Sequence, residues 1–119
     1  MSKHALVVKA DLTAELIDIA EQELSKLQAV VDGLIEAVQV NEDITMWVNE
    51  EGLFRSDLDT NYLASVILAV LSGGRQPLIK GNIVFTGSAD DNGETKGLQQ
   101  GDVDQITSMV KRATEALNH

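Results

Sequence analysis

The sequence contains no cysteine, and this absence excludes several kinds of chemistry at once. Disulfide bonds, thiol catalysis, zinc fingers and iron–sulfur clusters all depend on cysteine side chains. Basic residues are also scarce, because nine Lys and Arg stand against 19 Asp and Glu, which gives a net charge of −10. Nucleic-acid-binding domains use clustered Lys and Arg to contact phosphates, so we expect no direct binding of nucleic acid.

No apolar run approaches the roughly 20 residues that a membrane-spanning helix needs. Residues 1–4 also lack the long apolar segment of a signal peptide, so we expect a cytoplasmic protein that does not associate with membranes. The length of 119 residues is that of one domain, and 44% apolar with 24% charged residues is ordinary for a globular fold.

The negative charge is concentrated in the first half of the chain. Residues 11–59 carry 13 acidic side chains and only two basic ones, whereas the remainder carries six acidic and seven basic side chains. Such a charge keeps a protein soluble, and it would also suit the binding of a basic protein partner. The spacing of the acids does not distinguish these two roles.

Hydrophobic periodicity predicts an α+β fold, a single domain over residues 1–119. Strands are predicted at residues 4–10, 34–40, 44–49 and 79–87, and helices at 21–31, 62–71 and 102–117. Residues 12–20 fit either a helical stripe or the returning strand of a hairpin. The prediction is a mostly antiparallel sheet of about five strands with about three helices, whose open edges would allow a homodimer.

Several boundary residues follow from the same patterns. We expect Gly33 to end the first helix in the left-handed conformation and Asp59 or Thr60 to cap the second. The second helix is apolar nearly all round, which is typical of a buried helix. Gly81 is expected to form a bulge in the last strand, and Asp102 to cap the final helix.

The sequence offers no pattern that indicates catalysis or a metal. The loop at residues 90–95 has the composition of a calcium loop, but Thr95 and Gly101 stand where an EF-hand needs Gly and Glu. His4 and His119 lie at opposite ends of the chain, and no serine has the context of a nucleophile. We therefore expect no metal, no cofactor and no enzymatic activity.

The corner after the predicted strand at 44–49 combines acidic and amide side chains. We take it as the candidate partner-binding surface, formed by Asn49, Glu50, Glu51, Arg55, Asp57, Asp59 and Asn61. The two asparagines could instead cap main-chain groups. The candidates for stacking and phosphate contacts with a small ligand are Trp47, Tyr62, Arg75 and Lys80, although a core position would equally explain Trp47.

Five motifs carry a resemblance when they are taken in order. They are L-x-x-L-Q at residues 24–28, G-x-I-E at 33–36, N-E-E-G at 49–52, N-x-x-A-S at 61–65 and I-x-G-x-I-V-x-T-G at 79–87. Together they resemble an uncharacterised family of small proteins, a domain of unknown function, found in bacteriophages, prophages and plasmids. In that family the segment before L-x-x-L-Q looks like a pair of strands, which favours a strand at residues 14–20. Residues 55–59 depart from the family, because they are more acidic than the Gly- or Pro-containing turn expected there.

The resemblance implies an accessory protein of a mobile genetic element, by association rather than by mechanism. Small phage proteins often block a host defence protein or sequester its nucleotide signal. We therefore expect stoichiometric binding that inhibits a host protein. The alternatives are a sponge for a small nucleotide-like ligand and, second, a small enzyme.

Overall fold

The computed structural model describes residues 2–74 and 78–117, in which strands and helices are mixed along the chain. In chain order the elements are β1 (His4–Val8), β2 (Ala14–Asp18), α1 (Glu23–Val31), β3 (Ile35–Gln39), β4 (Ile44–Asn49), the short 3-10 helix η1 (Gly52–Phe54), α2 (Tyr62–Ser72), β5 (Ile83–Gly87) and α3 (Gln100–Leu117). None of the helices in these ranges is both long and apolar enough to cross a membrane.

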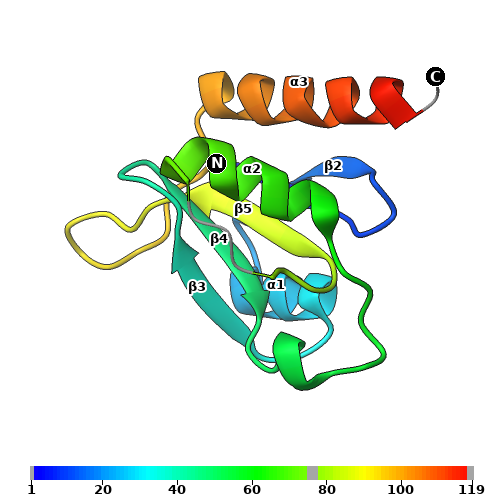
Figure 1. Ribbon diagram of the computed structural model, residues 1–119. Helices are drawn as coiled ribbons and strands as arrows, with labels where there is room; N and C mark the ends of the chain where they lie inside the picture. The colour runs from blue at the N-terminus through cyan, green and yellow to red at the C-terminus, as the bar shows by residue number, and fades with distance from the viewer. Residues whose placement is uncertain (1, 75–77, 118–119) are drawn as a thin grey trace.

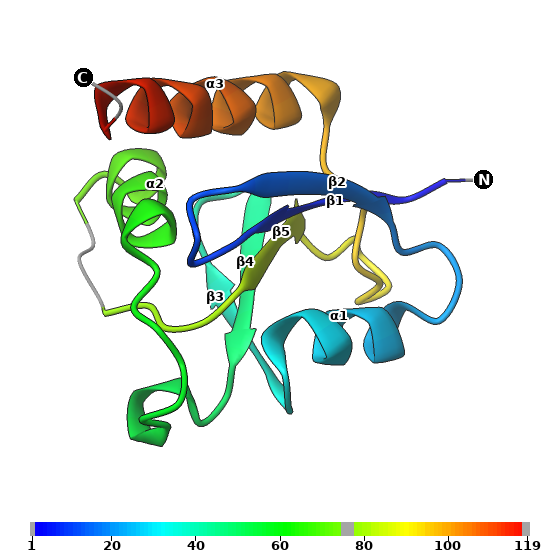
Figure 2. The same ribbon diagram turned by 90° about the vertical axis from the view of Figure 1, so that its right-hand side faces the viewer.

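The strands form one antiparallel sheet in the order β2-β1-β5-β4-β3. Two hairpins, β1–β2 and β3–β4, flank β5, which is the last strand in the sequence and pairs with both (Figure 1). Helix α1 covers one face of the sheet, and α2 and α3 cover the other (Figure 2). The predicted α+β class, with an antiparallel sheet of five strands and three α-helices, is confirmed.

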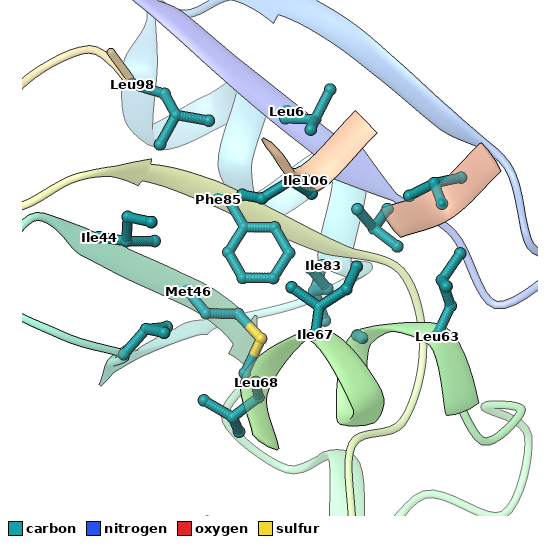
Figure 3. Packing of buried hydrophobic residues seen from close by; sticks show 14 of the residues in the cluster. Leu6, Ile44, Met46, Leu63, Ile67, Leu68, Ile83, Phe85, Leu98 and Ile106 are labelled. Carbon is teal, nitrogen blue, oxygen red and sulfur yellow. The ribbon is translucent and has the colours of Figure 1, made fainter. Parts of the chain in front are cut away.

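Alternating side chains of the strands form a separate apolar cluster on each face of the sheet. On the face covered by α2 and α3, the ring of Phe85 lies among Met46, Ile67 and Ile106, all four fully buried (Figure 3). The cluster under α1 is smaller and consists of Ala5, Val7, Ile19, Leu27 and Val84. The sheet is therefore buried on both sides, which explains why its central strands are rich in apolar residues.

Residues 14–18 are the strand β2, so the hairpin is confirmed and the helical alternative is wrong. Ala5 pairs with Ile17 and Leu6 with Leu16, in register with β1. Ile17 packs against the cluster under α1, whereas Leu16 lines the opposite face beside α3. Apolar residues on both faces of an edge strand give the spacing that also fits a helical stripe.

Helix α1 ends at Val31 as predicted, but the left-handed residue that ends it comes one position earlier than expected. Asp32, not Gly33, takes the left-handed conformation, with φ 62°, and its N–H donates to the carbonyl of Gln28. Gly33 follows with φ 154°. The glycine is needed for a different reason, a close contact with β4 that is described below.

Helix α2 corrects two expectations. Its N-cap is Asn61, whose side chain accepts from the N–H of Ala64, and neither Asp59 nor Thr60 caps it. It is also not buried all round, because Tyr62, Val66 and Val70 are 71%, 56% and 59% exposed on its outer side.

The last strand and the last helix also begin elsewhere than predicted. Thr60 and Lys80 form an isolated bridge, Gly81 makes a turn with φ 80°, and β5 begins only at Ile83. Gly81 is thus a turn residue rather than a bulge. Helix α3 begins at Gln100, so Asp102 lies in its first turn, where burial raises the pKa of its carboxyl.

Candidate functional site

Asn49 ends β4, and its side chain joins two parts of the fold. The side chain is nearly buried, and its amide nitrogen donates to the main-chain oxygens of Val31 at 3.0 Å and Asp32 at 3.1 Å. These are carbonyls at the end of α1, which lack partners within the helix. The amide oxygen accepts from the N–H of Glu51 at 2.8 Å. Asn49 therefore fixes the end of α1 to the turn that follows β4.

Gly33 lies directly against this amide. A β-carbon at Gly33 would lie 2.8 Å from Nδ2 of Asn49, a distance that β-carbons do not tolerate. Since Nδ2 is held by two hydrogen bonds, it cannot move away without breaking them. The glycine of G-x-I-E and the asparagine of N-E-E-G are thus parts of one packed unit.

Arg55 makes an ion-pair cluster at the surface of the same corner. Its Nη2 lies 2.9 Å from Oδ2 of Asp32 and also contacts Asp57, and its Nη1 donates to the carbonyl of Asp32 at 2.6 Å. Hydrogen bonds that Arg55 donates to Asp57 and then Asp32 raise the pKa of Arg55, and the same bond to Asp57 lowers the pKa of Asp57. Lys80 donates to the carbonyl of Arg55. The cluster ties the connection after η1 to the end of α1.

Asn61 is completely buried, and among the described residues its side chain bonds only main-chain groups. Its amide nitrogen donates to the carbonyls of Val8 at 3.0 Å and Gly81 at 2.9 Å, and its oxygen accepts from Ala64 at 2.9 Å. Asp59 is exposed nearby, and its carbonyl accepts from the N–H of Gly81. Of the partner-binding residues expected from the sequence, Asn49 and Asn61 lie inside the fold and the acidic ones lie at its surface.

The residues expected to hold a small ligand do not converge. Trp47 packs against the cluster under α1 and donates from Nε1 to the hydroxyl of Thr86 at 2.8 Å. Tyr62 is exposed at the start of α2, on the opposite face of the sheet. Lys80 is bonded to the carbonyl of Arg55, and Arg75 lies outside the described residues. Among the described residues, no three His, Asp or Glu side chains are grouped as metal ligands.

An open groove of about 380 Å³ lies at this corner, between the ends of β3 and β4, η1 and residues 78–80. Its walls are largely apolar and include side chains that are strongly exposed: Phe54 at 90%, Leu53 at 65% and Leu78 at 56%. Val38 and Val48 form its floor on the sheet. The groove can accept an apolar side chain from another molecule.

Carboxylates surround the groove. Glu36 and Glu50 line it, and Glu51 is exposed beside it. Within residues 2–74 and 78–117 none of the three is part of an ion pair, and Lys80, which also lines the groove, is bonded to Arg55. The rim therefore carries negative charge that the described residues do not neutralise.

The apolar part of this site was not predicted from the sequence. Leu53 and Phe54 are an apolar pair inside an otherwise polar connection, and that contrast is a signal that could have indicated them. Leu78 gave no such signal, because it directly precedes the strand predicted at residues 79–87.

A family model described as a domain of unknown function, DUF3846, matches residues 1–111. The chain belongs to this family. The match covers every strand, both α1 and α2, and most of α3, so the fold described above is that of the family domain in this chain. No curated protein and no solved structure shows significant similarity to the chain.

Proposed function

We propose that this member of the DUF3846 family is a non-catalytic accessory protein of phage or prophage type, which inhibits a host defence protein by stoichiometric binding. The observation that carries the proposal is the apolar groove between Leu53, Phe54 and Leu78, with a rim of carboxylates that form no ion pair with the described residues. Apolar surface enclosed by charged residues is typical of protein-binding sites.

The charge of the site favours a basic partner surface. Glu36, Glu50 and Glu51 face solvent beside the groove, and the whole chain has a net charge of −10. Complementary charge increases the rate of encounter and disfavours acidic competitors. The mobile-element part of the proposal is supported by the sequence motifs that resemble proteins of phages, prophages and plasmids.

The proposal is tested by phage infection of bacteria that each carry one defence system. The protein is expressed in every strain, and plaques are counted with a phage that the resident system restricts. We expect plaque numbers to recover in at least one strain, because the bound defence protein no longer acts. If no strain recovers across a broad set of systems, the inhibitory function is wrong.

Two double variants test whether such recovery of plaques depends on the groove. Leu53→Ser with Phe54→Ser removes the exposed apolar side chains of η1, and should abolish recovery. Val66→Ser with Val70→Ser removes two similarly exposed side chains from the outer side of α2, and should leave recovery intact. Equal loss in both double variants would argue against the groove.

A thermal shift measurement distinguishes the nucleotide sponge from the protein inhibitor. A ligand that binds only the folded state raises the apparent melting temperature. We expect no rise with cyclic dinucleotides, since Trp47, Tyr62 and Lys80 do not share a site. A clear rise would favour the sponge over the protein inhibitor.

A further inference from the structure

The sheet has two edge strands, β2 and β3. On each of them, the hydrogen bonds to the neighbouring strand show which main-chain groups point outward. On β3, Leu34 accepts from Glu50 and Val40 donates to Ile44, so both face β4. Because antiparallel strands alternate, the N–H and C=O groups of Ile35 and Ala37 face away from β4. In the part of the chain that the structure describes, β3 is the last strand on its side of the sheet (Figure 1).

The other edge, β2, is partly covered by its own chain. The outward carbonyl of Asp18 accepts from Nζ of Lys26 at 2.7 Å. The carboxylate of Asp18 accepts from the N–H groups of Lys3 and Ala20, both at 2.9 Å. In the described part of the chain no side chain covers Ile35 or Ala37 of β3 in this way. β3 also contains none of the Lys or Pro residues that protect many edge strands.

The groove opens beside this unprotected edge. Glu36 and Val38 of β3 point to the face of the sheet where the groove lies, and both line it. A strand added to β3 would therefore place every second side chain next to Glu36, Val38 and the apolar walls. The open edge and the groove form one continuous surface.

We propose that β3 binds an extended, basic segment of the partner protein as an additional antiparallel strand, an inference that rests on the proposed function. Ile35 and Ala37 exchange main-chain hydrogen bonds with the segment. An apolar side chain opposite Val38 enters the groove beside Phe54. A Lys or Arg opposite Glu36 lies in a non-hydrogen-bonded pair, where side chains are closest.

Charge selects this occupant over a second copy of the chain. Two copies would each bring a net charge of −10 and their own Glu36 to the shared edge. A basic segment neutralises Glu36 and Glu50, and a second basic residue opposite Leu34 reaches the vicinity of Glu50, which pairs with Leu34. The recognised pattern, read from the N-terminus of the segment, is apolar-x-basic-x-basic.

The test uses a synthetic capped peptide, TLTKTKT, and the matched peptide TLTETET. Amide hydrogen exchange of the full-length protein is followed by NMR with each peptide in excess. We expect TLTKTKT to slow exchange at Ile35 and Ala37 by about tenfold or more, because their N–H groups become hydrogen-bonded. Ala14 and Leu16, which face outward on β2, should not change, and TLTETET should slow none of the four. Unchanged exchange at Ile35 and Ala37 with TLTKTKT would overturn the inference.

Two proline variants test strand addition to β3 in infected cells. Ala37→Pro removes an outward N–H from β3, and Ala14→Pro removes one from β2; edge strands tolerate proline at such positions. In the plaque assay we expect Ala37→Pro to abolish recovery and Ala14→Pro to retain it. Recovery by the folded Ala37→Pro variant would refute strand addition while the inhibitory function stands. Absence of recovery by the unaltered protein would refute the function, and the peptide measurement would still decide the binding mode.

Sedimentation tests the alternative that a second copy of the chain occupies this edge. We expect the protein to be monomeric over the accessible concentration range. A dimer that Ala37→Pro dissociates and Ala14→Pro does not would assign the edge to self-association and overturn the basic segment.

Discussion

Asn49 and Asn61 each make three hydrogen bonds to main-chain groups, but their surroundings differ. Asn61 is completely buried between β1, the turn at Gly81 and the first turn of α2. Asn49 is 6% exposed at the rim of the groove, where Arg55 also bonds the carbonyl of Asp32. The same residue type serves both places, and we expect the loss in free energy of unfolding on its removal to depend on whether water or a second side chain can replace the amide.

The largest effect is expected for Asn61→Ala. The substitution leaves the carbonyls of Val8 and Gly81 and the N–H of Ala64 without their partner in a dry interior. We expect the free energy of unfolding to fall by about 3 kcal/mol, measured by urea denaturation. The matched control is Asn92→Ala in an exposed loop, which should change it little. Equal losses in both variants would contradict the structural role of Asn61.

Asn49→Ala should cost less, about 2 kcal/mol, since this site is next to the surface. Combining it with Arg55→Ala tests whether Arg55 holds the same main-chain group, because Arg55 and Asn49 both donate to the carbonyl of Asp32. We expect the double variant to lose more than the sum of the single losses, measured by a double-mutant cycle in urea. Simple additivity would show that the two side chains act independently.

Gly33→Ala tests the close packing of Gly33 against the side chain of Asn49. The added β-carbon meets Nδ2 of Asn49, and φ 154° is unfavourable for alanine. We expect a loss of about 1.5 kcal/mol in the unaltered protein, and a smaller loss in the Asn49→Ala background, where the contact is gone. The measurement is again urea denaturation. An identical loss in both backgrounds would mean that the backbone conformation alone causes it.

The smallest effect concerns pH. Arg55 lowers the pKa of Asp57 below the usual 3.8, so the ionised carboxylate stabilises the fold above that pH. This stabilisation is lost as the pH falls through the lowered pKa. Arg55→Gln should therefore make the acid loss of stability shallower, and raise the pKa of Asp57 in an NMR titration. The pKa of Asp18, which accepts from Lys3 and Ala20, should stay the same. Because Asp57 is exposed, added salt should diminish the difference.

The architecture was predictable because its signals are local. Residues 34–49 alternate around a short polar turn, and this pattern alone predicts the β3–β4 hairpin. The ends of elements were less predictable. Asp32 and Asn61 cap α1 and α2 through contacts with β4, β1 and the turn at Gly81, which are distant in the sequence. The motif resemblance, rather than periodicity, favoured the strand at residues 14–20.

The site was predictable only in its acidic part. Glu50 and Glu51 lie at the corner because charged residues after a strand are usually solvated. The groove depends on Leu53 and Phe54 together with Leu78, which is distant from them in the sequence, and Lys80, which also lines it, forms the bridge with Thr60. An asparagine that caps a helix and one that binds a ligand look the same in the sequence. Only the fold shows that Asn49 and Asn61 bond main-chain groups.

The central position of β5 has a consequence for synthesis on the ribosome. When residues 1–80 have left the exit tunnel, the strands of both hairpins are available, yet neither hairpin has the partner that β5 provides. The inner edges of β1 and β4 are then unpaired, and unpaired apolar strands are prone to misassembly. The sheet closes only after residues 83–87 leave the exit tunnel. A chain that ends before β5 would therefore expose the inner edges of both hairpins at once.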